Sequence, residues 1–164
     1  MEYDEAKHKF IQAWGTLGSS WGINKAMAQI HALLLISKQP LSTEDVMEEL
    51  QISRGNANMN IRALIDWGIV QKELIVGERK EHFVAIKDVW ELARQVSKER
   101  RKREIEPIVR VLNEVQAVTG DTDSVREFKK MTGELKDFSL KVDGALDKFT
   151  RSDKNWFFKM LLKL

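Results

Sequence analysis

The stretch LLLISKQPLSTEDVMEELQISRGNANMNIRALIDWGIV, residues 33–70, predicts two short helices joined by a tight turn. Ser42, followed three residues later by Asp45, forms the pattern of a capping box, so a helix is expected to begin there. Ser53 is a second N-cap residue, and its helix is expected to run to the residue before Gly68, which supplies a left-handed conformation beyond the helix end. Two helices of this length and spacing indicate a helix-turn-helix.

The segment that follows changes its apolar period from about 3.6 to 2, which is typical of strands. Alternation over residues 70–76 predicts a first strand with Leu74 and Val76 on one face. Residues 77–80, Gly-Glu-Arg-Lys, are expected to turn the chain, and residues 83–86 return it as a second strand. A hairpin directly after a helix-turn-helix indicates the wing of a winged-helix domain.

Two further helices are expected before this unit. The first carries apolar residues at spacings of three and four, with three glycines leaving its end open: Ala6, Phe10, Trp14, Leu17 and Trp21, with Gly15, Gly18 and Gly22. The second begins near Ile23, is apolar on more than one side, and ends at Ile36 because the residue before Pro40 is biased away from helix. Its apolar character predicts burial.

Two long helices are expected after the hairpin. Asp88 and Glu91 predict the start of a helix of roughly thirty residues, which Pro107 should kink or restart and Gly120 should end. From Ser124 a last helix has apolar residues spaced alternately by three and four, as in a coiled-coil seam. They are Phe128, Met131, Leu135, Phe138, Val142, Ala145 and Phe149.

The predicted fold is mainly α with a small β-hairpin: an N-terminal helix over 1–22, a winged helix-turn-helix over 23–87 and long dimerisation helices over 88–164. The chain ends in an apolar tail that contains Trp156, Phe157, Phe158, Met160, Leu161, Leu162 and Leu164. Because exposed patches of that size are uncommon on monomers, the tail is expected to pack on a second subunit. We therefore expect an obligate homodimer formed through residues 1–20 and 105–164.

The amino-acid sequence of residues 33–80 and the order of the predicted elements resemble those of the winged-helix transcriptional regulators of the MarR superfamily, in particular the GbsR-type group. The likeness extends loosely to the pairs Trp14-Gly15 and Trp21-Gly22 before this stretch and to ERRKREIEP after it. It implies a homodimer that binds double-stranded DNA at a near-palindromic operator, most often as a repressor, and that loosens when an effector binds.

The helix that starts at Ser53 is the expected recognition helix. If Ala57, Ile61 and Leu64 face inward, a turn of about 100° per residue leaves a small or polar outward face: Arg54, Gly55, Asn58, Met59 and Arg62, with Asn56 at the helix start. In the major groove, arginine pairs with guanine and asparagine with adenine. The alternative for Asn56 is that it serves only as a helix-start residue. Asn60 is expected to be structural. Met59 departs from the polar residue that relatives often have.

The wing completes the candidate interface. The resemblance places Arg79 and Lys80 at a minor-groove contact, whereas the alternative is an exposed turn kept soluble by charge. Lys72 on the first wing strand is within reach of a phosphate. The candidate DNA contacts are thus Ser53, Arg54, Asn56, Asn58, Met59, Arg62, Lys72, Arg79 and Lys80.

Net charge is near neutral, with 27 Lys+Arg against 25 Asp+Glu. Residues 41–87 hold six bases and eight acids, so modest non-specific DNA affinity is expected. The acids of residues 41–51 are expected on a face turned away from DNA. The basic cluster over 98–103 winds around its helix and is interrupted by Glu99, so we interpret it as a solvated linker rather than a nucleic-acid patch.

Other classes of function are disfavoured. The chain has no cysteine, its three histidines are isolated, and no catalytic spacing stands out, so neither an enzyme nor a metal site or cofactor is expected. No apolar run is long enough to cross a membrane and no signal-peptide pattern is present, which predicts a cytoplasmic protein. The alternative function is a winged helix used for protein–protein interaction without DNA binding.

Trp14, Trp21 and Trp90 are the candidate effector-binding residues. Aromatic faces attract quaternary ammonium ions, and some GbsR-type relatives are associated with choline or glycine betaine. Ordinary packing of large rings in the core is the competing and favoured interpretation. His31, among apolar neighbours, is expected to be a core residue or to line an effector pocket, with the core favoured.

Overall fold

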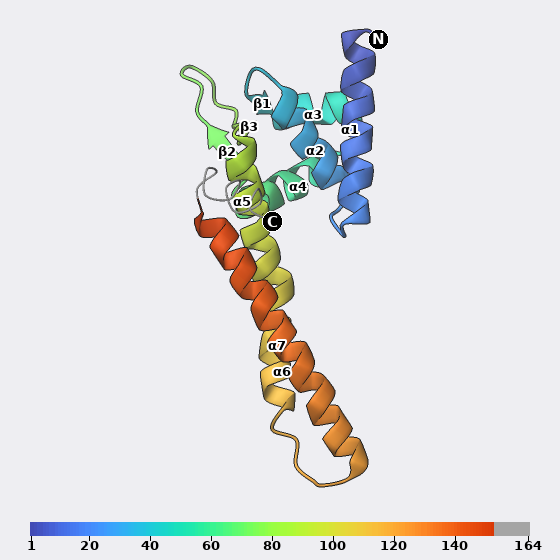
Figure 1. Cartoon of the computed structure of the whole chain (residues 1–164). Coiled ribbons are helices and arrows are strands. Elements are labelled where there is room, and N and C mark those ends of the chain that lie inside the picture. Colours follow the sequence, from blue (N-terminus) through green and yellow to red (C-terminus); the bar gives the residue numbers. More distant parts are fainter. Residues whose placement is uncertain (153–164) are drawn as a thin grey trace, which may run out of the picture. The chain divides into compact units, whose positions relative to one another are not determined.

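The computed structural model describes residues 1–152 (Figure 1). In chain order the elements are α1 (Tyr3–Ser20), α2 (Lys25–Ile36), β1 (Leu41–Ser42), α3 (Thr43–Leu50), α4 (Arg54–Asp66), β2 (Val70–Glu73), β3 (His82–Ala85), α5 (Val89–Arg100), η1 (Arg101–Ile105), α6 (Glu106–Val115) and α7 (Asp123–Arg151). They form two compact units, residues 1–92 and the chain from residue 93 onward. The predicted class is confirmed, a mainly helical winged helix-turn-helix with a long C-terminal helix.

The helix-turn-helix begins its helices where the sequence predicts. At α3, the Ser42 backbone N–H donates to Asp45 Oδ2 over 2.7 Å and the Asp45 N–H donates to Ser42 Oγ over 3.2 Å, which completes the capping box. At α4, Ser53 Oγ accepts from the Asn56 N–H at 3.3 Å. The turn between the helices contains Gln51 in a left-handed conformation with φ 53°, so a non-glycine residue closes α3.

The core of the first unit surrounds α2, which packs against α1, α3, α4 and β3. Among residues 1–152, the largest fully buried side chains all come from this unit: Ile30, Leu33, Leu34, Val46, Ile61, Leu64 and Val70. Burial on more than one side of α2 confirms the prediction from its apolar sequence. His31 is 5% exposed and therefore also belongs to this core.

Two glycines that left the end of the first helix open in the sequence lie inside α1. A Cβ atom at Gly18 would lie 2.5 Å from the Ala28 Cβ, and one at Gly15 would lie 2.6 Å from Gln29 Cγ. These glycines therefore let α1 approach α2 closely. The helix stops just before Gly22, whose φ is 75°.

The sheet has three strands in the order β1-β3-β2, all antiparallel. Strand β1 was not predicted, because two residues are too few to show an alternating pattern. It pairs Leu41 with Phe83 and so ties the start of the helix-turn-helix to the wing. On the other side of β3, Val70 of β2 pairs with Ala85.

The prediction for the first wing strand was wrong beyond Glu73. Leu74 and Val76 lie in the loop between β2 and β3, where they are 89% and 101% exposed. The pairing of β2 ends at Glu73 because β3 begins at His82, so the residues between have no strand opposite them. The wing loop is consequently longer than the expected four-residue turn.

The second unit contains η1, α6 and α7, and α6 lies beside α7 (Figure 1). Before Pro107 the helix widens to a π-helical turn, in which the Glu106 N–H donates to the Arg101 carbonyl five residues back. Regular α-helix resumes at Glu106, which confirms the predicted restart at Pro107. The predicted end of this helix at Gly120 was wrong, because α6 already stops at Val115. Residues 116–122, which include Gly120 with φ 116°, form the connection to α7.

Helix α7 begins after Thr122, whose Oγ1 accepts from the Val125 N–H at 3.3 Å. Most of its apolar seam points to solvent: Phe128, Met131, Leu135 and Phe138 are 43%, 44%, 52% and 66% exposed. The apolar tail from Trp156 to Leu164 lies outside the described residues. No helix of the described part is apolar over a length that would cross a bilayer.

Candidate nucleic-acid interface

Helix α4 has the two faces that its sequence predicts. Ala57, Ile61 and Leu64 are 0–2% exposed and pack into the core, whereas Met59 is 61% exposed. Arg54 and Arg62 are exposed with it. The N-terminal half of α4 therefore presents cationic and polar groups to solvent, in a helix whose first turn also offers free backbone N–H groups.

The asparagines of α4 are partly engaged. Asn60 is 3% exposed, and its Nδ2 donates to the Asn56 carbonyl at 2.9 Å and to Asn56 Oδ1 at 2.6 Å, so its predicted structural role is confirmed. Asn58 is half-buried, and its Oδ1 accepts from Thr43 Oγ1 at 3.3 Å. A bidentate contact to adenine uses the amide oxygen, and in Asn56 and Asn58 this oxygen already accepts one hydrogen bond within the chain.

One acid lies beside this face, contrary to expectation. Glu44 of α3 accepts from Arg54 Nη2 over 2.8 Å, and the bond lowers the pKa of the Glu44 carboxyl. Lys80 of the wing also lowers this pKa through its charge. The prediction that all acids of residues 41–51 turn away from the interface was thus wrong for Glu44. A count of charges along the chain hides the pair, because its members lie on different helices.

The wing carries its cations in an open loop. Arg79 and Lys80 are exposed, and Gly77 adopts φ 90° in the same loop. Below the loop, Lys72 Nζ lies 2.5 Å from Glu81 Oε1, and both side chains are more than half exposed. Lys72 is thus partly neutralised, whereas Arg79 and Lys80 form no ion pair within residues 1–152.

The base of the wing is braced by a buried histidine. His82 is 6% exposed; its Nδ1 lies 3.1 Å from the Lys80 carbonyl and its Nε2 lies 3.2 Å from Glu78 Oε2. Sequence reasoning missed this residue. Its position at the first residue of β3, opposite Ser42 and Glu73, is the feature that buries it.

Arginines of the basic cluster, residues 98–103, form ion pairs with acidic side chains of the second unit. Arg101 donates from Nε to Asp143 Oδ1 over 2.6 Å and from Nη2 to Asp143 Oδ2 over 3.0 Å, and its Nη1 lies 3.2 Å from Asp147 Oδ1. Arg103 Nε donates to Glu99 at 3.0 Å. These contacts favour the interpretation of the cluster as a linker rather than a nucleic-acid patch.

The candidate effector residues lie on different elements. Trp14 of α1 contacts the Phe10 ring at 5.5 Å and the His31 ring at 6.3 Å between centroids, and its Nε1–H donates to His31 Nδ1 over 3.3 Å. Trp21, just after α1, is 56% exposed, and Trp90 of α5 is half-buried. Trp14 therefore packs with Phe10 and His31 rather than with the other two tryptophans.

Comparison with known proteins finds similar proteins that are described as transcriptional regulators. No protein-family model matches the chain. The HTH-type transcriptional repressor GbsR of Bacillus subtilis (strain 168) is 24% identical over 114 residues, which cover 70% of this chain and 63% of the relative, so the match spans less than two thirds of GbsR. A crystal structure of a transcriptional regulator superposes with a TM-score of 0.56 at 17% identity, covering 87% of this chain and 99% of that one.

Both similar proteins are described as transcriptional regulators and neither as an enzyme, in agreement with the sequence prediction. The structural match supports the winged-helix fold, and the sequence match adds common ancestry. The chain is a winged helix-turn-helix protein and a distant homologue of the transcriptional repressor GbsR.

Proposed function

We propose that the chain is a DNA-binding transcriptional repressor that acts in the cytoplasm as a homodimer on a near-palindromic operator. The observation that carries this proposal is the exposed face of α4, where Arg54, Met59 and Arg62 lie opposite a fully buried face. Such a helix reads base edges in the major groove, while Arg79 and Lys80 of the wing reach the minor groove. Homology to a repressor supports the same role.

The homodimer is supported by apolar surface that the single chain leaves open. On α1, Leu17 is 40% exposed, and on α7 Leu135 and Phe138 are 52% and 66% exposed. Exposed apolar surface on a helix marks an interaction site when it forms a large patch. In a two-fold dimer the two α4 helices would enter successive major grooves about 34 Å apart.

Selection of bound sequences from a random duplex pool tests the proposal. We expect enrichment of paired half-sites about one helical turn apart. Arg79→Ala should weaken binding to the enriched duplex and reduce its salt dependence, because one phosphate-proximal cation is lost. Arg126→Ala, an equal charge change on α7, is the matched control. If no sequence is enriched, the winged helix is instead a protein-interaction module.

Regulation by an effector stays a prediction for Trp14, Trp21 and Trp90, with a quaternary ammonium compound as the ligand class. Thermal-shift measurements with choline and glycine betaine at millimolar concentration test it. Stabilisation that is lost in Trp21→Ala would support the idea, and no stabilisation would remove it.

A further inference from the structure

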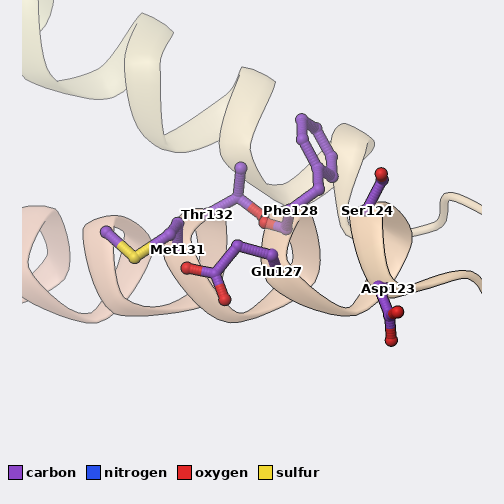
Figure 2. A pocket seen from close by; sticks show the side chains of 6 residues that line it. All are labelled: Asp123, Ser124, Glu127, Phe128, Met131 and Thr132. Carbon is purple, nitrogen blue, oxygen red and sulfur yellow. The ribbon is translucent and has the colours of Figure 1, made fainter.

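The apolar seam of α7 has an open hollow at its N-terminal end. The hollow, of about 480 Å³, is lined by Phe128, Met131, Thr132, Glu127, Ser124 and Asp123, all from the first turns of α7 (Figure 2). A surface lined by one helix alone lacks an opposing wall. A second helix laid along the seam would supply that wall.

Charges beside the seam change sign halfway along α7. With Phe128 and Leu135 at a positions of the heptad, the preceding g positions are Glu127, Glu134, Lys141 and Lys148. All four are exposed, and none forms an ion pair with any residue of the described part of the chain. By contrast, Asp143 and Asp147, off the seam, are paired with Arg101. The four g charges are therefore available to a partner.

We propose that two copies of the chain pair through α7 in antiparallel orientation, with the acidic half of one helix against the basic half of the other. In an antiparallel coiled coil, g positions face g positions of the second helix. Glu127 then lies opposite the partner's Lys148, and Glu134 opposite the partner's Lys141. The two-fold axis makes each pair occur twice. This inference rests on the homodimer of the proposed function and specifies its geometry.

The alternative orientation gains nothing from these charges. In a parallel coiled coil each g position faces an e position of the second helix. The e positions of α7 are Val125, Thr132, Ser139 and Leu146, none of which is charged. The sign change along the helix thus favours antiparallel pairing specifically.

The apolar layers agree with the register set by the charges. When Glu134 faces the partner's Lys141, Leu135 at an a position lies against the partner's Phe138 at a d position. Both side chains are largely exposed in the single chain, at 52% and 66%. This exposed part of the seam therefore lies at the centre of the proposed interface.

Spin labels at three equivalent positions test the geometry in the full chain without DNA. The chain has no cysteine, so Lys130→Cys, Asp137→Cys and Gly144→Cys each give one label, all at c positions one heptad apart. Antiparallel pairing predicts the shortest interlabel distance at residue 137, with the axial offset about 21 Å longer at both 130 and 144. Equal distances at the three sites, or absence of any dimer, would overturn the proposal.

Charge reversal gives a second readout. The double variants Glu127→Lys/Glu134→Lys and Lys141→Glu/Lys148→Glu should each lose dimer in sedimentation velocity by several-fold. The quadruple variant, which has the wild-type composition, should regain it, as should a mixture of the two double variants. Failure of both to regain dimer would overturn the pairing. If labels and reversals succeed but duplex selection enriches nothing, the DNA-binding function fails and the pairing stands.

Discussion

The first and second units differ in how deeply their apolar side chains are buried. In the first unit, Ile30, Leu33 and Leu64 are at most 1% exposed. In the second, α7 has no buried residue among those described, although its sequence has the seam of a coiled coil. The first unit therefore has a core of its own, whereas the second leaves an apolar face for which a core is expected only on association. The stability of the second unit should accordingly depend on protein concentration, whereas that of the first unit should not.

The largest expected effect comes from truncating the core of the first unit. Leu33→Ala should cost about 2–5 kcal/mol of unfolding free energy, because it removes a fully buried side chain and leaves a cavity. Its loss in Tm should not change with protein concentration. Leu135→Ala on α7 is the matched variant, and its loss in Tm should depend on concentration because it weakens association. Calorimetry over a hundred-fold concentration range, about 2 to 200 μM, compares them.

If the loss in Tm depends on protein concentration in the same way for Leu33→Ala and Leu135→Ala, the proposed difference between the two units is wrong. A concentration-independent loss for Leu135→Ala would mean that α7 is stabilised within one chain.

Acid should destabilise the first unit through His31. Burial, aided by the charge of Lys87, lowers the pKa of His31 to about 4, whereas its unfolded value is about 6.5. The unfolded chain therefore binds a proton between these values that the folded chain does not. Stability should be complete above pH 6.5 and should decrease as pH falls toward 4, by about 3 kcal/mol at most.

Denaturant unfolding at pH 7 and pH 4.5 checks the His31 effect. His31→Gln should flatten the difference between the two pH values, and His8→Gln, an exposed histidine, is the control. A pH dependence unchanged in His31→Gln would contradict the assignment.

Features set by neighbouring residues were predictable, and those set by distant partners were not. The caps at Ser42 and Ser53 follow from bonds spanning three residues, so the helix starts were predicted correctly. Strand β1 exists only because Leu41 meets Phe83 far along the chain. The coiled-coil seam was visible in the sequence, yet its exposure was not, because periodicity tells which face is apolar and not what covers it.

The candidate DNA site divides in the same way. The outward direction of Arg62 and Met59 follows from helical periodicity around Ala57. The engagement of Asn58 by Thr43 depends on the packing of α3 against α4, which no local pattern encodes.

A smaller effect is expected at the end of α2, the helix central to the first unit. Lys87 Nζ donates to the carbonyls of Leu34 at 2.8 Å, Leu35 at 2.6 Å and Ser37 at 2.7 Å, where helix carbonyls otherwise lack partners. Lys87→Met should lower the free energy of unfolding by about 1–2 kcal/mol, since the site is partly exposed. Lys38→Met, an exposed lysine nearby, should have little effect. Urea unfolding at neutral pH distinguishes the two variants, and equal losses would count against the cap.

The smallest expected effect concerns the proposed DNA-binding face of the first unit. Glu44 holds Arg54 at 2.8 Å, so docking on DNA has to exchange this bond for one to a phosphate or a base. Glu44→Gln should therefore tighten binding to the selected duplex by a few-fold and steepen its salt dependence, because Arg54 becomes free to release a counterion. Glu48→Gln on the same helix removes the same charge from a carboxylate that has no ion pair among the described residues. Fluorescence anisotropy with both variants separates release of Arg54 from the general loss of an acid. If the two variants bind equally, the Glu44–Arg54 pair has no part in DNA affinity, and the first unit presents α4 without restraint from α3.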